Sequence, residues 1–199
     1  MAHSILLKLD REKAPLLYPL LRRGFRIRVD AGTPLRTVLT RELGISGDAA
    51  LQRIQTVLLD GSPVDDLEAA LPAGSSTLAL SAAMPGLLGA TLRRSGVYAG
   101  LRSSISHAFK GSEVGEGSQD LRVKLYNVLA EEWGGHFLDR GIRVESGEFA
   151  SVAAQRLPDL EQALREVRID GSFVSVEALW DWLERRPAGE LIELQVARE

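Results

Sequence analysis

Ile5-Leu6-Leu7-Lys8-Leu9 stands near the start of the chain, and Leu121-Arg122-Val123-Lys124-Leu125 repeats its pattern far downstream. Both stretches place apolar residues at the first, third and fifth positions, which predicts strands with one buried face. Each is followed by a Leu- or Trp-containing stretch and then by an Arg-Gly step into a second strand, at 23–29 and 140–144. Since solenoid units are shorter than this repeat, the pattern predicts one small domain that has been duplicated.

The first copy has the order strand, strand, helix, strand, strand. We predict its strands at 5–9, 25–29, 54–59 and 77–82 and helical segments at 11–23 and 35–43. Thr33 followed by Pro34 favours a helix start, with a capping side chain and then proline at the first helical position. Gly44 is placed to end that helix, and Asp60-Gly61 predicts a tight hairpin turn.

The second copy repeats this order with one addition. We predict strands at 121–126, 142–144, 167–169 and 191–196 and helices at 128–138, 149–157 and 176–183. Pro158 stops the second of these helices, and a resumed helical face through 160–164 is an open alternative. Asp170-Gly171 repeats the hairpin turn of the first copy. The helix at 176–183 has no counterpart in the first copy, so the two copies have diverged.

Two stretches resemble a known family. Val123-Lys124-Leu125-Tyr126-Asn127-Val128-Leu129-Ala130-Glu131-Glu132-Trp133-Gly134 resembles the opening of the molybdopterin-synthase small subunit. The stretch from Val57-Leu58-Leu59-Asp60-Gly61 through Val64 to Leu71-Pro72-Ala73-Gly74 and Thr77-Leu78-Ala79-Leu80 is similar to the closing half of that family and of the thiamine sulfur carriers. Both families have the ubiquitin-like β-grasp fold.

The resemblance implies an α+β protein made of two tandem β-grasp (ubiquitin-like) domains joined by a partly helical connector. The domains are expected at 1–84 and 120–199, with a basic, glycine-containing connector and flexible linker at 85–119. In the carrier families, the chemistry takes place at a C-terminal Gly-Gly. Here the first copy continues through Met84-Pro85-Gly86-Leu87, the second ends at Val196-Ala197-Arg198-Glu199, and Gly134-Gly135 falls inside a predicted helix. The chain as written therefore offers no free Gly-Gly carboxylate and is not expected to act as a sulfur carrier.

Composition sets further bounds on function. The chain has 199 residues, no cysteine, and a net charge of −3. The lack of cysteine excludes disulfides, thiolate metal sites and thiol nucleophiles. No signal peptide and no apolar run long enough for a membrane span are visible, so we expect a cytoplasmic protein. The arginine pairs are short and stand beside acidic residues, without a broad basic face, so we expect no nucleic acid partner.

The segment between the copies is the most distinctive part of the sequence. Residues 69–112 contain no acidic residue but four cations, namely Arg93, Arg94, Arg102 and Lys110. One interpretation is a structural connector with solvated arginines, and a membrane-surface helix is another, with too few cations to favour it. A third is a contact element in which leucines supply buried area and arginines bind carboxylates or phosphates. The residues predicted to contact a partner are Met84, Leu87, Leu88, Arg93, Arg94 and Tyr98.

No catalytic or metal-binding pattern stands out, and we predict no cofactor. His3, His107 and His136 lack metal-ligand spacing, and His3 is expected in a frayed end. The adjacent carboxylates Asp65-Asp66 and Glu131-Glu132 point in different directions on regular elements, so solvated charge explains them. Trp182 lies off the apolar stripe of its helix and is a contact candidate, with core packing as the alternative.

The sequence therefore predicts a non-enzymatic, ubiquitin-like protein-binding or scaffold protein whose protein partner is unidentified. A homodimer is also compatible with two similar domains. Two alternatives stay open. Cleavage after Gly86 would expose a glycine end and give a processed sulfur or protein-conjugation carrier. Arg94 and Arg102 would instead hold an anion or other small ligand in a groove between the two domains.

Overall fold

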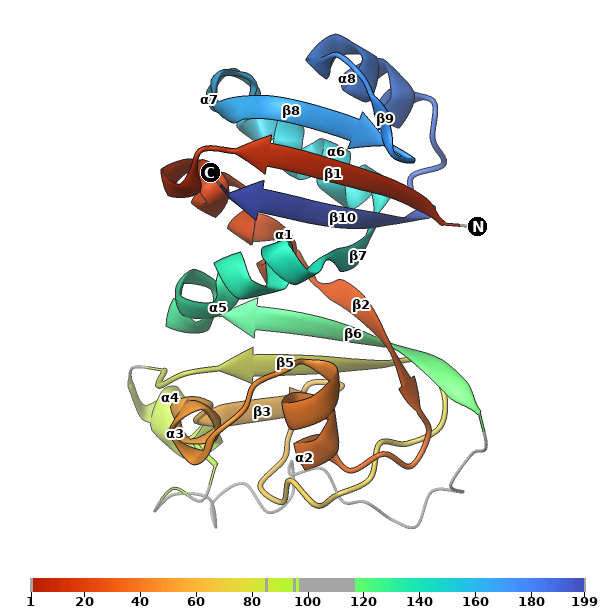
Figure 1. The fold of residues 1–199 in the computed structure, drawn as a ribbon. Coiled ribbons are helices and arrows are strands. Elements are labelled where there is room, and N and C mark those ends of the chain that lie inside the picture. Colours follow the sequence, from red (N-terminus) through yellow and green to blue (C-terminus); the bar gives the residue numbers. More distant parts are fainter. Residues whose placement is uncertain (1, 85, 95, 97–116, 199) are drawn as a thin grey trace. The chain divides into compact units, whose positions relative to one another are not determined.

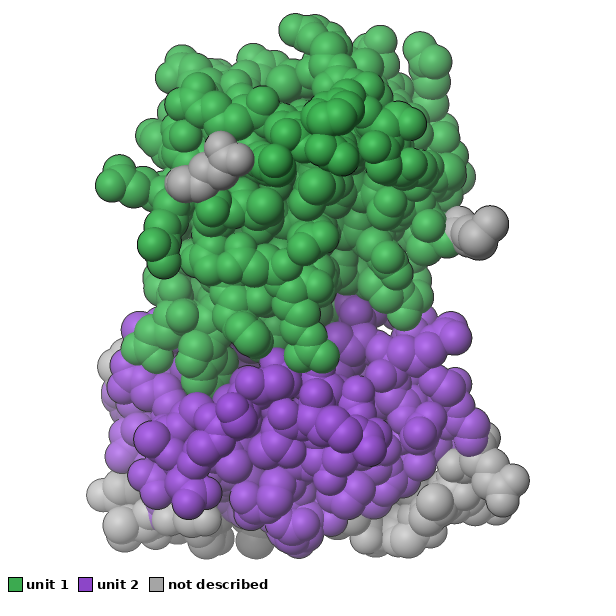
Figure 2. All heavy atoms as spheres, viewed as in Figure 1, with its two compact units in different colours: residues 1–25, 130–199 green, residues 26–129 purple. Residues whose placement is uncertain are grey.

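The computed structural model describes residues 2–84, 86–94, 96 and 117–198. The chain divides into two compact units: unit 1 contains residues 1–25 and 130–199, and unit 2 contains residues 26–129. Figure 2 colours unit 1 green and unit 2 purple. Each unit contains residues from both halves of the chain, so the units do not correspond to the two copies in the sequence.

The strands of unit 1 surround a strand from the N-terminus. They follow the order β7 (Ile142–Glu145), β10 (Leu191–Arg198), β1 (His3–Leu9), β8 (Leu164–Ile169) and β9 (Ser172–Phe173). Strand β1 pairs parallel with β10, from His3 opposite Ile192 onward, and antiparallel with β8. In Figure 1, the red β1 accordingly lies between two blue strands from the other end of the chain. Its alternate residues Ile5 and Leu7 are buried in the core of unit 1.

Unit 2 is completed by the first strand of the second half. Its order is β4 (Ser62–Pro63), β3 (Thr56–Leu59), β5 (Ser76–Ser81), β6 (Ser118–Tyr126) and β2 (Phe25–Asp30). Strands β5 and β6 are parallel, with Ser76 opposite Leu121 and Ser81 opposite Tyr126. Val123 is fully buried on β6. The α+β class is as predicted, but the first strand of each half pairs with strands of the other half.

The prediction of two tandem β-grasp domains is therefore wrong. The strands of the described chain form one mixed sheet of ten, in the order β4-β3-β5-β6-β2-β7-β10-β1-β8-β9. The alternation of apolar residues fixes which face of a strand is buried, but it does not fix which strand lies beside it. β1 and β6 carry nearly the same apolar pattern. As a result, β1 lies beside the strands of the second half, where β6 was expected, and β6 lies beside the strands of the first half, where β1 was expected.

Both predicted hairpin turns are confirmed, and they share the same local geometry. Asp60 and Asp170 have φ of 49° and 50°, each followed by a glycine in the same left-handed region, as the predicted tight turns require. Asp60 Oδ1 accepts a hydrogen bond from the backbone N–H of Thr77 on β5 (2.7 Å). Asp170 Oδ1 accepts one from the N–H of Ser4 on β1 (2.9 Å). Strand β1 thus takes beside β8 the place that β5 takes beside β3.

The helices follow the predicted segments with local differences. Unit 1 contains η1 (Arg11–Leu17, 3₁₀), α1 (Tyr18–Arg23), α5 (Val128–Arg140, from Ala130 onward), α6 (Ser146–Gln155), α7 (Leu157–Ala163) and α8 (Val176–Glu184). Unit 2 contains α2 (Leu35–Thr37), its π-helical continuation η2 (Val38–Glu42), the unpredicted α3 (Asp48–Arg53) and α4 (Gly86–Leu92). The additional helix of the second copy is confirmed as α8, capped by Ser175, whose Oγ accepts from the N–H of Ala178 at 3.2 Å.

The predicted helix start at Thr33-Pro34 is displaced by one residue. Pro34 keeps an extended backbone and Leu35 is the first helical residue. The Thr33 hydroxyl donates to the carbonyl of Asp30 and does not cap the helix. Gly44 has φ of 68°, directly after the helical segment, which confirms its predicted role as a terminator.

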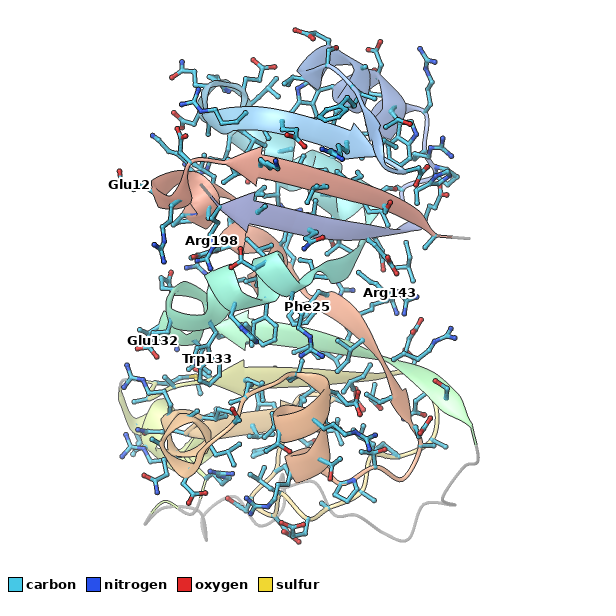
Figure 3. The ribbon with its side chains drawn as sticks, viewed as in Figure 1. Glu12, Phe25, Glu132, Trp133, Arg143 and Arg198 are labelled. Atoms are coloured by element: carbon cyan, nitrogen blue, oxygen red, sulfur yellow. The ribbon has the colours of Figure 1, made fainter. Side chains whose placement is uncertain are left out.

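The two glycines of α5 allow close packing inside unit 1. A Cβ at Gly134 would lie 2.7 Å from the ring of Tyr18, so only glycine fits against α1 there. Gly135 is buried as well. Phe25, labelled in Figure 3, packs against Phe137 of the same helix with ring centroids 5.2 Å apart. This Gly-Gly pair therefore serves helix packing, consistent with its predicted place inside a helix.

Candidate functional site

A surface pocket on unit 2 of about 390 Å³ gathers charged side chains from four segments of the chain. Its size falls within the range of small-ligand pockets. The lining residues are Arg36, Asp48, Leu51, Gln52, Asp65, Asp66, Leu67 and Arg94. We call it the Arg36–Arg94 pocket.

Backbone hydrogen bonds hold the start of α2 against the loop that follows β4. The N–H of Leu35 donates to the carbonyl of Ala69 (3.0 Å) and that of Arg36 to the carbonyl of Leu67 (2.8 Å). Asp66 Oδ1 accepts from the N–H of Glu68 at 2.9 Å, which shapes the loop after β4. The start of α2 and this loop therefore lie side by side, which brings Arg36 and the two aspartates of the loop to one pocket.

Arg94 enters the pocket from the end of α4. Its backbone N–H donates to the carbonyl of Gln55 (2.6 Å), and Nη2 of its guanidinium donates to the carbonyl of Leu51 at 3.4 Å. Among the described residues, that long bond is the one hydrogen bond of the guanidinium, although arginine has five N–H donors. Burial lowers the pKa of Arg94, the charge of Arg36 lowers it further, and Asp65 opposes both effects. Arg94 is thus a half-buried cation with donors left to use.

Arg36 differs from Arg94 because it is already paired. Its guanidinium donates to Glu68 in an ion pair. This hydrogen bond and the charge of Glu68 raise the pKa of Arg36, and Asp48 and Asp66 add to the effect. The pocket as a whole combines two guanidinium groups with the three carboxylates of Asp48, Asp65 and Asp66. Such a lining suits a ligand that carries both signs of charge.

The helix α4 leads to Arg94 of this pocket and carries two of the predicted contact residues, Leu87 and Leu88. Leu87 is 72% exposed, the most exposed of the large hydrophobic residues in the described chain. Arg93 is exposed and Met84 half-buried. A Cβ at Gly89 would lie 2.8 Å from that of Met84, so the glycine lets the helix pack closely on the chain before it.

The other residues predicted for the site are Tyr98, Arg102 and Gly86. Tyr98, Arg102 and the side chain of Leu88 lie outside the described residues. Arg94 belongs to a pocket within unit 2. Gly86, the residue named for a processed carrier, is the first residue of α4, with φ of 79°.

Sequence reasoning missed Arg36 and Asp48 and treated Asp65 and Asp66 as solvated charges. All four line the pocket. Arg36 and Asp48 lie on short helical segments with no motif around them, so no signal in one sequence marks them. The adjacency of Asp65 and Asp66 was visible, but the pairing of their loop with α2 depends on the tertiary fold.

A second polar cluster, in unit 1, surrounds His3. Its Nδ1 donates to Asp170 Oδ2 at 2.7 Å, and its Nε2 accepts from Nη1 of Arg186 at 3.2 Å, because arginine can only donate and a carboxylate only accepts. Trp182 packs edge-on to the imidazole (5.2 Å) and lies under the guanidinium of Arg186 (4.4 Å). His3 therefore anchors the start of β1 to unit 1, and the expectation of a frayed end is wrong. Trp182 is half-buried in this cluster.

Asp170 makes the stability of unit 1 dependent on pH. The backbone N–H of Ser4, and then His3, lower the pKa of Asp170. A carboxylate with a lowered pKa in the folded state stabilises the fold above its unfolded value of about 3.9 and loses that contribution as the pH falls through the folded pKa. Because solvent screens the interactions of a side chain that is 48% exposed, we expect Asp170→Asn to cost about 0.5 kcal/mol or less at pH 7 and progressively less below pH about 4. Urea unfolding followed by tryptophan fluorescence at several pH values measures this.

Asp60→Asn is the matched control, because Asp60 has the same position in the turn of unit 2. It should leave the tryptophan-monitored curve unchanged, since all three tryptophans belong to unit 1. A constant stability difference between Asp170→Asn and the parent at every pH would contradict this account.

No family model, curated protein or solved structure matches this chain. Across the described residues, no helix has both the length and the apolar character to cross a membrane. In the same part of the chain, no three histidine, aspartate or glutamate side chains gather as metal ligands.

Proposed function

We propose that this chain is a binding protein that recognises a partner polypeptide through α4 and the adjoining Arg36–Arg94 pocket of unit 2. The observation that carries the proposal is the pairing of Leu87 on α4, 72% exposed, with the half-buried Arg94, which has unused donors and follows the last residue of α4 by two positions. Protein contact sites have an apolar centre and are enriched in arginine. The complete lack of cysteine fits a reducing compartment, so the proposal places the protein in the cytoplasm.

Two contacts support α4 as a defined surface. Gly89 packs closely on Met84, and the N–H of Arg94 binds the carbonyl of Gln55. Both ends of the helix are thereby tied to the chain around them, while Leu87 points away from the core. A helix fixed in this way loses little further freedom when it binds, which favours affinity.

Photo-crosslinking at position 87 tests the proposal. With a photoreactive residue at 87 in the source cells, we expect one discrete adduct with another protein. The adduct should disappear when Arg93→Glu and Arg94→Glu are added, because the partner's carboxylate then meets negative charge. The adduct partner, once purified, should bind the parent chain and bind Leu87→Ser at least about tenfold more weakly.

Position 173 provides the matched control. Phe173 is 68% exposed but lies on β9 of unit 1, so a photoreactive residue there should not capture the same protein. Equal capture at both positions, persistence in the double arginine variant, or an adduct made only of this chain would overturn the proposal. Unchanged thermal unfolding of each variant excludes loss of the fold as the cause.

A further inference from the structure

We infer that the Arg36–Arg94 pocket binds a partner segment in which a carboxylate stands next to a cationic side chain, with the carboxylate on Arg94 and the cation against the aspartates. This inference rests on the proposed function and names the chemistry that the partner must present. It concerns a site built from four segments that no motif in the sequence connects.

The carboxylate position follows from the donors of Arg94. The guanidinium is half-buried and, to the described residues, makes one hydrogen bond of 3.4 Å. The other N–H donors of this guanidinium are not fully buried, and a carboxylate would accept from them in charge-assisted hydrogen bonds, which are stronger than those between neutral groups. Arg36 lies on the same pocket and repels Arg94, so a single negative charge bound there would relieve the repulsion. A carboxylate also matches the planar fork of a guanidinium.

The cation position follows from the rest of the lining. Asp48, Asp65 and Asp66 border the same pocket, which therefore has three negative groups against two positive ones. A ligand with a negative charge alone would meet these carboxylates, and a ligand with a positive charge alone would meet the arginines. A neighbouring pair of opposite charges satisfies both sets.

The same charges disfavour phosphate. A phosphate group carries close to two negative charges at neutral pH, which three aspartates would repel more strongly than one carboxylate. A free amino acid has the right charges but no group for Leu87. The exposed leucine on the adjoining helix is the reason to assign the ligand to a polypeptide.

A set of short peptides tests the inference by NMR. Acetyl-Leu-Gly-Glu-Lys-amide is expected to shift the amide resonances of Arg36, Leu67 and Arg94 in a saturable way at millimolar concentrations. Replacing its Glu by Gln should abolish the shifts. Replacing its Lys by acetyl-lysine should weaken binding about two- to fivefold, as for partly exposed ion pairs. Inorganic phosphate should leave these resonances unchanged.

Variants of the chain provide the controls. Arg94→Gln should weaken peptide binding at least about tenfold, and Arg94→Lys should weaken it less because the charge remains without the fork. Asp48→Asn should remove most of the preference for lysine in the peptide. Arg53→Gln is the matched control, because Arg53 lies on α3 but does not line the pocket. It should bind like the parent.

Several outcomes would overturn the inference. Phosphate binding as tightly as the peptide, equal binding of the Gln peptide, or no saturable shift would each contradict it. Free glutamate binding as tightly as the peptide would assign the pocket to small molecules. If the peptides fail while crosslinking at position 87 still depends on Arg93 and Arg94, the inference fails and the proposed function stands. If the peptides bind but position 87 captures no protein, the proposed function fails and the charge preference of the pocket stands.

Discussion

Replacing Leu7 by aspartate is expected to unfold unit 1, although Leu7 lies near the N-terminus and most of unit 1 comes from the C-terminal half. Leu7 is fully buried on β1, opposite Val196 of β10 and Val167 of β8. An unpaired charge at such a position costs several kcal/mol, about 4 or more. Hydrogen exchange should show loss of protection in β8 and β10, and tryptophan emission should shift to the red.

The tryptophans make this result easy to assign. Trp133, Trp180 and Trp182 all belong to unit 1. Leu39→Asp is the matched control, because Leu39 is equally buried but lies in unit 2. It should spare the protection of β8 and β10. If Leu7→Asp instead exposes the amides of β3 and β5 while tryptophan emission is unchanged, the pairing of β1 with the C-terminal half is wrong.

The converse substitution, Val123→Asp on β6, is expected to unfold unit 2. Val123 is fully buried and lies opposite Leu78 of β5, so the same cost of about 4 kcal/mol or more applies. Protection should fall in β3 and β5, whereas tryptophan emission should stay close to that of the parent. Thermal unfolding by circular dichroism should show an early transition that tryptophan fluorescence does not report.

Lys124→Gln controls for the strand itself. Lys124 is the next residue of β6 and faces the opposite side of the sheet, opposite Ala79, so its replacement should change stability by no more than about 0.5 kcal/mol. A comparable loss of protection in Lys124→Gln and Val123→Asp would show that β6 is sensitive to any change. Loss of protection in β8 and β10 on Val123→Asp would contradict the strand order of both units.

Local structure was largely predictable from the sequence, whereas strand pairing was not. The Asp-Gly turns, the strands around them and the additional helix α8 follow from short-range rules on backbone conformation and periodicity. The partner of β1 does not follow from such rules. Ile5, Leu7 and Leu9 are buried at alternate positions of β1, and Leu121, Val123 and Leu125 are buried at the corresponding positions of β6. Two strands with one pattern fit either position, and the free-energy difference between the two arrangements depends on contacts spread over the whole sheet.

The residues of the candidate site also divide into those that the sequence predicted and those that it did not. Leu87 and Arg94 stood out because the segment between the copies lacks acidic residues. Arg36 and Asp48 did not, because their approach to Arg94 depends on hydrogen bonds between segments far apart in the chain. His3 illustrates the point most simply: its partners Asp170 and Arg186 are at the other end of the sequence.

The pairing of His3 with Ile192 also sets an order of events during synthesis. Residues 26–129 are contiguous, so unit 2 can fold while the ribosome is still translating the rest of the chain. Unit 1 has to wait until its last strand has been released, and the N-terminal strand stays available to chaperones until then. Contacts of such long sequence separation also slow folding, so a nascent chain that stalls after residue 129 should contain one finished unit and one unprotected apolar strand.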